Sequence, residues 1–152
     1  RLLRYGANYS QTVGQGWLLR VQVNGQVSAE PLVPGEQFGA GGASSVRGFD
    51  EREVAGDSGA FAGAEIETPN WCPPTASFQC RAVAFTDAAR TSRRRALAGE
   101  ARRASIAGAG IGLRIAVDRN ASLQVDYARV IDAGGSRERG DSRVHVALAL
   151  SY

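Results

Sequence analysis

Apolar and polar residues alternate with a period of two along most of this chain. The clearest example is segment 143–152, where one face carries Val144, Val146, Leu148, Leu150 and Tyr152. Successive side chains of a strand point to opposite faces, so this pattern predicts a β-strand with one apolar face. The same alternation predicts strands over 1–11, 17–27, 106–117 and 121–131, and weaker ones near 58–68 and 80–88.

The lengths of these strands and of their connections indicate a membrane protein. Most strands cover roughly nine to twelve residues, whereas soluble strands usually have about five or six. About ten residues is the length that a tilted strand needs to cross a bilayer. Short connections (12–16, 118–121) and an intermediate one (69–79) alternate with long ones (28–57, 89–105, 132–142). Outer-membrane barrels alternate short periplasmic turns with long external loops in this way.

We therefore predict an all-β fold, an antiparallel transmembrane β-barrel to which residues 1–152 contribute about seven strands. Bacterial barrels are closed and even-numbered, because an open edge in lipid would leave backbone groups unpaired. The expected domain is the C-terminal part of a larger barrel, with further strands before Arg1. A soluble β-sandwich or lipocalin-like barrel, acting as a binding module, is the alternative that the pattern leaves open.

Composition narrows the functional classes. The net charge is +3, from 18 basic and 15 acidic residues, and the arginines are spread over many segments, which does not indicate a nucleic-acid partner. No stretch approaches the roughly 18 apolar residues of a membrane helix. No cluster of catalytic side chains emerges, so we expect no enzyme activity, no cofactor and no metal site.

The two cysteines, Cys72 and Cys80, flank Pro73 and Pro74 in the intermediate connection. This spacing suits a small disulfide loop and is too poor in ligands for a cysteine-only zinc site. A disulfide would indicate an oxidising compartment and fits a periplasmic connection. Free thiols are the alternative.

A long glycine-rich connection carries the most specific motifs of the chain. It contains Gln37-Phe38, Gly41-Gly42, the run Ser45-Val46-Arg47-Gly48-Phe49 and Gly56-Asp57-x-Gly59. Glu65 follows in the next strand, and the segment Ala84-Phe85-Thr86-Asp87-Ala88-Ala89 comes after it. In this order the motifs resemble the two-partner secretion transporters of the haemolysin activation/secretion type, within the superfamily of the barrel-assembly insertase. Ala89 stands where the family has glycine.

The resemblance implies a sixteen-stranded outer-membrane pore. Such a pore exports one large secreted partner polypeptide, haemolysin-like or adhesin-like, from the periplasm to the cell surface without nucleotide hydrolysis. The final Leu150-Ser151-Tyr152 resembles the aromatic C-terminal signal, ending at Tyr152, that the barrel-assembly machinery recognises. An insertase that assembles other barrels is the nearest alternative function.

The resemblance also implies roles for individual residues. Loop 28–57 would fold into the barrel, so that Arg47 of the Val46-Arg47-Gly48-Phe49 motif meets Asp87 on the wall. Phe85 and Glu65 would be further wall partners of the loop. A planar guanidinium suits a carboxylate, and a partly dry lumen makes the pairing necessary. The alternative is an exposed loop with a solvated arginine.

A second group of arginines lies in segment 90–103, whose composition permits a short helix. We expect an external loop here, and the outer leaflet around it contains lipid and lipopolysaccharide. Arg93, Arg94 and Arg95 are candidate contacts to lipopolysaccharide phosphates. The alternative is a solvated loop with no lipid contact.

Overall fold

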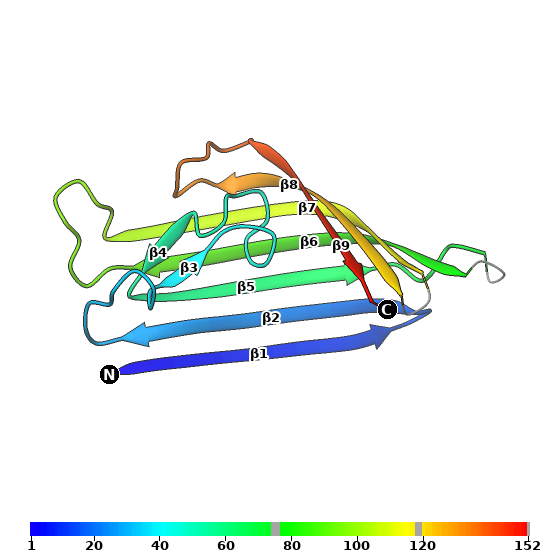
Figure 1. Ribbon diagram of the computed structural model, residues 1–152, viewed down its shortest axis with the longest axis horizontal. Helices are drawn as coiled ribbons and strands as arrows, with labels where there is room; N and C mark the ends of the chain where they lie inside the picture. The colour runs from blue at the N-terminus through cyan, green and yellow to red at the C-terminus, as the bar shows by residue number, and fades with distance from the viewer. Residues whose placement is uncertain (74–76, 118–119, 152) are drawn as a thin grey trace.

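The computed structural model describes residues 1–73, 77–117 and 120–151. Seven long strands form one antiparallel sheet in the order β1-β2-β5-β6-β7-β8-β9, which curls towards one side (Figure 1). The strands are β1 Leu2–Val13, β2 Trp17–Ser28, β5 Ser58–Glu67, β6 Phe78–Ser92, β7 Arg103–Val117, β8 Ala121–Asp132 and β9 Ser142–Leu150. Within the described residues, β1 pairs only with β2 and β9 only with β8, so both edges are free.

The predicted all-β antiparallel fold is confirmed, and the alternation predicted the long strands to within a few residues. Two details differ. β6 and β7 extend to Ser92 and from Arg103, so their connection is only 93–102 and contains no helix. None of the described segments forms an apolar helix of membrane-spanning length.

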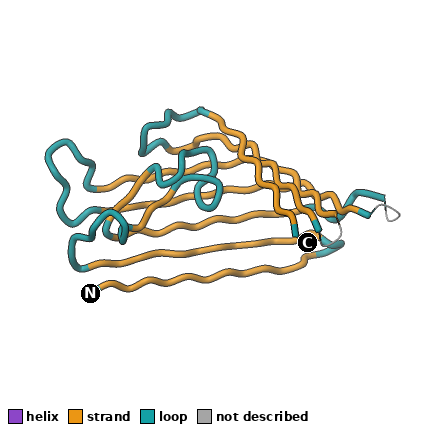
Figure 2. The backbone as a smooth tube through the Cα atoms, in the orientation of Figure 1, coloured by secondary structure: helices purple, strands orange, loops and turns teal. Residues whose placement is uncertain are grey.

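The connection after β2 folds back over one face of the sheet instead of extending from its end (Figure 2). It contains a short hairpin that the alternation did not predict, β3 Phe38–Ala40 paired with β4 Val54–Gly56. We call the face that it covers the inner face and the opposite one the outer face. The ends where connections 29–57, 93–102 and 133–141 lie form the long-loop end of the sheet.

The two faces have opposite chemistry. On β6 the inner positions Val83, Phe85, Asp87 and Ala89 are buried, while the intervening residues are exposed. Large apolar side chains dominate the outer face, where they are exposed. They include Tyr9, Val23, Ile111, Tyr127, Val146 and Leu148. Away from the residues packed under the folded-back connection, the inner face also carries charges, including Arg20, Glu65, Arg114 and Asp126. An apolar exterior around an interior with charged groups is the arrangement of a sheet that faces lipid on one side and a lumen on the other.

Candidate functional site

The glycine-rich connection presents its motif by a tight turn on the inner face. Gly41, Gly42 and Gly48 have positive φ angles of 118°, 99° and 102°, a backbone conformation that other residues rarely adopt. The Ser45 hydroxyl accepts a hydrogen bond from the Gly41 N–H at 2.8 Å, and the Gly42 N–H donates to the Val46 carbonyl at 3.1 Å. These bonds close the turn and direct the following residue, Arg47, towards the sheet.

Arg47 forms a two-pronged ion pair with Asp87 on β6. Its Nε donates to Asp87 Oδ2 at 2.7 Å and its Nη2 donates to Oδ1 at 3.0 Å. The backbone N–H of Arg47 also donates to Oδ2 at 3.3 Å. Arg47 is 9% exposed and Asp87 is 2% exposed, so this bidentate pair is largely removed from water.

Three strands contribute carboxylates around the same guanidinium. Arg47 Nη1 donates to Glu65 Oε2 on β5 at 2.8 Å and to Asp126 Oδ2 on β8 at 3.3 Å. The guanidinium carbon lies 3.4 Å from the centroid of the Phe85 ring, a cation–π contact. We call Glu65, Asp87 and Asp126 the carboxylate cluster. Because burying an unpaired charge is costly, the cluster makes this part of the wall a specific seat for a cation.

A second arginine shares two members of the carboxylate cluster. Arg114 on β7 donates to both oxygens of Asp126, at 2.6 and 3.1 Å, and its Nη2 donates to Glu65 Oε2 at 3.3 Å. Arg47 and Arg114 therefore compete for Glu65 Oε2 and Asp126 Oδ2, whereas Asp87 binds Arg47 alone among the described residues. At its other end the network reaches Arg20, which forms an ion pair with Glu67.

Beside this network, strands β7 and β9 contact the backbone of the loop. A Cβ on Gly108 of β7 would overlap the carbonyl oxygen of Arg47, so only glycine permits this approach. On β9, His145 Nε2 accepts a hydrogen bond from the Gly48 N–H at 3.1 Å. The acceptor nitrogen must be unprotonated for this bond, which makes His145 a neutral contact for the loop.

Apolar contacts hold the residues on both sides of Arg47. Val46 and Phe49 are each 0% exposed and belong to one cluster with residues of the wall. The cluster comprises Ala40, Val46, Phe49, Val54, Phe61, Ala89, Ile106 and Val130. Ala89, which replaces the glycine of the family motif, packs within this cluster, so its methyl group is accommodated. The loop is thus seated by packing as well as by charge.

Asp57 anchors the long-loop end of the same connection. Its Oδ1 accepts from the Leu32 N–H at 2.8 Å, and its Oδ2 accepts from the Arg94 N–H at 2.7 Å. Burial on its own would raise the pKa of Asp57, but these hydrogen bonds and one from Gln37 hold it below its ordinary value. Stability from this group is present above the ordinary carboxylate pKa and is lost as pH falls through the lowered one.

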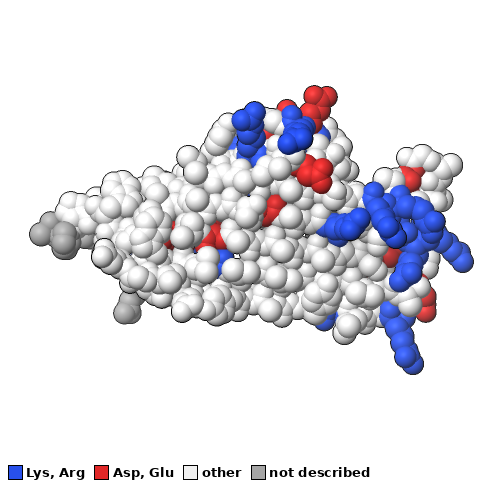
Figure 3. Space-filling model, turned by 180° about the vertical axis from the view of Figure 1, so that it is seen from behind, with Lys and Arg blue, Asp and Glu red and all other residues white. Residues whose placement is uncertain are grey.

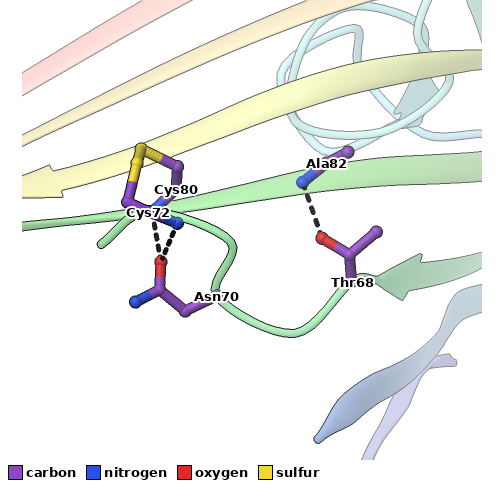
Figure 4. The surroundings of a disulfide bond; sticks show 5 residues. All are labelled: Thr68, Asn70, Cys72, Cys80 and Ala82. Atoms are coloured by element: carbon purple, nitrogen blue, oxygen red, sulfur yellow. Dashed lines mark hydrogen bonds between the residues drawn. A yellow bond between two sulfur atoms is a disulfide. The ribbon is translucent and has the colours of Figure 1, made fainter. Parts of the chain in front are cut away.

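The cysteines form the disulfide Cys72–Cys80 at the opposite end of the sheet (Figure 4). Asn70 Oδ1 accepts hydrogen bonds from the backbone N–H groups of both cysteines, at 3.2 Å from Cys72 and 2.8 Å from Cys80. The Thr68 hydroxyl accepts from the Ala82 N–H at 3.0 Å. The disulfide and these bonds together fasten the connection to the start of β6.

Removing this disulfide should lower stability without affecting the loop seat. For a loop with a sequence separation of 8, chain entropy gives about 2–3 kcal/mol. Folded and unfolded barrels migrate differently in electrophoresis of samples that have not been boiled. We expect reductant to lower the temperature at which the folded band is lost. A Cys72→Ser/Cys80→Ser variant should start at the lower temperature and show no further change with reductant; a further drop would disprove this explanation.

A cavity of about 620 Å³ lies on the inner face next to the tip of the loop. Its wall is polar and carries both charges, with Arg20, Arg81 and Arg114 facing Glu65, Glu67 and Asp126. Gln22, Gln79 and Gln124 also line it. Such a surface offers hydrogen bonds to polypeptides of many sequences.

The structure brings together the site residues that the sequence pointed to on the loop, β5 and β6. Three further residues of the site were not predicted. Asp126 and His145 contact the loop, and Arg114 contacts Glu65 and Asp126. The strand register brings Asp126 and Arg114 together on the inner face. Tyr152, the expected assembly signal, lies outside the described residues. Of the three candidate lipid-contacting arginines, Arg93 and Arg94 have partners within the protein, Glu100 and the Ser28 carbonyl.

A comparison with known protein families matches the part of the chain that contains the loop and strands β1 to β6. Residues 1–115 match the family described as haemolysin secretion/activation protein ShlB/FhaC/HecB. The chain belongs to this family. Its members are outer-membrane transporters of two-partner secretion, so the sheet is part of an outer-membrane β-barrel. The family is one of transporters and not a class of enzymes. No curated protein matches the chain.

A solved structure has the same fold. It is CdiB from Acinetobacter baumannii, which is similar over 98% of this chain with a TM-score of 0.71 and 24% sequence identity. The match covers 26% of the CdiB chain, so the present chain corresponds to a minor part of a transporter of that size. The long-loop end of the sheet faces the cell surface, because long connections are external in outer-membrane barrels.

Proposed function

We propose that residues 1–152 are the C-terminal part of a larger barrel that exports one large partner polypeptide from the periplasm to the cell surface without nucleotide hydrolysis. The observation that carries this proposal is the loop seated on the inner face through Arg47. It occupies the lumenal side of the wall without closing a binding pocket. Beside it, the polar cavity lined by both charges suits an extended polypeptide of varied sequence.

In this proposal export needs both positions of the loop: seated on the carboxylate cluster in the resting state, and withdrawn while the partner passes. Withdrawal of Arg47 would leave the buried Asp87 and Asp126 and the partly buried Glu65 without that partner, and stranded buried charges are strongly destabilising. Arg114 reduces this cost, because it already donates to Glu65 and Asp126. After withdrawal it would neutralise both, and Asp87 would be the main unpaired group. Arg114 is thus proposed as a positioning residue that lowers the free energy needed to withdraw the loop.

The test of the export function is secretion of the partner by cells that carry the complete transporter. Transfer of the partner from the periplasm to the medium should depend on this protein. In sealed outer-membrane vesicles without nucleotide on either side of the membrane, transfer should continue. Normal secretion in its absence, combined with a defect in the assembly of unrelated barrels, would identify an insertase instead.

The role of Arg114 predicts an effect opposite to that of a simple wall stabiliser. In Arg114→Gln, Asp126 depends on Arg47 alone and Glu65 keeps only Arg47 and the more distant Arg20, so we expect the loop to stay seated longer. A cysteine introduced at Ala40, which is 1% exposed in the seated loop, should react several-fold more slowly with a maleimide added from the periplasmic side, and export should slow. Faster labelling would show that Arg114 only supports the wall.

A further inference from the structure

The outer face carries a charged group at its long-loop end, in contrast to its apolar middle. Figure 3 shows this face largely uncharged, with arginine side chains gathered at the end where connection 93–102 lies. Two of these arginines are on the strands and not in the loop: Arg90 on β6 and Arg103 on β7. Their neighbours Ala89, Thr91 and Ala104 point to the inner face, so both arginines point outwards.

The strand register places these arginines next to two hydroxyl groups. Arg90 is directly opposite Ser105, and Ser92 is directly opposite Arg103. The four residues form a cross-strand square in which arginine and serine alternate, and we call it the Arg/Ser quartet. The two arginines are diagonal neighbours, with Cα atoms about 7–8 Å apart in such an arrangement, close enough for both guanidinium groups to reach one anion.

No carboxylate of the described residues neutralises the two arginines. Neither Arg90 nor Arg103 takes part in an ion pair there. The acidic neighbour is Asp132, which accepts a hydrogen bond from the Ser105 hydroxyl at 2.7 Å and forms no ion pair with either arginine among those residues. Like charges on neighbouring strand positions repel each other unless an anion lies between them. Ser105 thus has an acceptor, whereas the two guanidinium groups and the Ser92 hydroxyl have none among those residues.

The position of the Arg/Ser quartet along the strands identifies the environment of that anion. A charge on the lipid-facing side is costly at the middle of the membrane and nearly free at its interface. Arg90 and Arg103 lie within the last three residues at the long-loop ends of their strands, the end that faces the cell surface. The quartet is thus at the headgroup level of the outer leaflet.

The surface next to the quartet also suits a lipid with several acyl chains. From the quartet towards the middle of the sheet, the outer face of three neighbouring strands carries small side chains: Ala60, Ala62, Ala88, Ala107 and Ala109. On β8, the exposed Arg129 lies opposite Ala109, and the taller Tyr127 lies opposite the next outer residue of β7, Ile111. Acyl chains can approach the backbone closely over the alanines while the headgroup remains beside the arginines.

We propose that the Arg/Ser quartet binds a phosphate of the lipid A part of lipopolysaccharide in the outer leaflet. Arg90 and Arg103 would each donate to the phosphate oxygens, and Ser92 would add a hydroxyl donor. Arg95, exposed in connection 93–102, lies near enough in sequence to add charge, whereas Arg93 and Arg94 are held by contacts within the protein. This site lies on the lipid side of the wall and does not depend on the export mechanism.

The test compares two double variants of the full-length transporter in detergent. Arg90→Gln/Arg103→Gln removes the two quartet arginines. Arg137→Gln/Arg139→Gln removes the same charge from connection 133–141 and is the matched control. Binding is measured with purified bisphosphorylated lipid A, and in parallel with phosphatidylglycerol. We expect the quartet variant to bind lipid A roughly tenfold or more weakly, and the control to bind as the wild type does.

Several outcomes would overturn the proposal. Equal lipid A binding by the wild type and the quartet variant would show that the quartet is not the site. An equal loss in the control would show that net charge alone governs binding. Phosphatidylglycerol bound as tightly as lipid A would assign the site to phospholipid. Export by the quartet variant is recorded separately, so a failure of the lipid site and a failure of the proposed export function remain distinguishable.

Discussion

Replacing Arg47 by alanine in the complete transporter is expected to reduce export of the partner while leaving insertion of the barrel largely intact. The variant strands the buried Asp87 and removes one cation from Glu65 and Asp126. Breaking one side of a buried pair costs roughly 3–5 kcal/mol. At 1.4 kcal/mol for each factor of ten, the seated state of the loop should lose about two or more orders of magnitude in its equilibrium.

Two readouts separate the loop from the wall in this experiment. Export is measured as partner released to the medium, and insertion as the folded mobility of the barrel in unboiled samples. Arg137→Ala is the matched control, because Arg137 pairs with the exposed Asp50 at 3.6 Å, and an exposed pair contributes little. Wild-type export by Arg47→Ala would refute the assigned role, and failure of Arg47→Ala to insert would show a purely structural one.

Exchange of the charges tests whether the contact is direct. In Arg47→Asp/Asp87→Arg the ion pair can form again with reversed polarity, so partial recovery of export relative to Arg47→Asp is expected. Recovery should be incomplete, because an arginine at position 87 would also face Glu65 and Asp126 from a different direction. Arg47→Lys should keep the charge but lose the fork that binds both Asp87 oxygens, and we expect an intermediate export rate.

The sequence predicted the long strands because the two sides of this sheet face different surroundings. Lipid outside and a polar lumen inside impose an alternation that local residues reveal, as in β9 with Val144, Val146 and Leu148 against Arg143 and His145. Near Arg90 and Ser92 both faces are polar, so the alternation ends there although the β6–β7 pairing continues to Ser92. The alternation therefore predicts a connection over 89–105, where the quartet lies.

The site could be predicted only in part, because its members meet through strand register. Arg47 and Asp87 were recognised from their motifs. Arg114 and Asp126 come from neighbouring strands, where Gly112 is opposite Asp126 and Arg114 is opposite Gln124. Gly112 leaves room for the Asp126 carboxylate, so the diagonal pair can form. Nothing in the local sequence of either strand shows this pairing before the strands are aligned.

Gly108→Val is expected to be the most damaging single change on the wall strands for the seat of the loop. A Cβ at this position would overlap the carbonyl oxygen of Arg47, and a branched side chain would add to the clash. The β7 backbone is held by its hydrogen bonds to β6, and the Arg47 backbone is held by its contact with Asp87, so neither can move away easily. The loop should therefore be displaced, although valine itself favours a strand.

The matched control for this variant is Ala109→Val, the next residue of the same strand. Ala109 points to the outer face, so the added methyl groups meet lipid and not the loop. We expect Gly108→Val to raise the maleimide labelling of a cysteine at the buried Ala40 several-fold and to impair export, and Ala109→Val to change neither. The two variants place the same valine side chain on adjacent residues of one strand and on opposite faces, so their difference reports on contact with the loop. Equal labelling would mean that the Arg47 segment does not rest on Gly108.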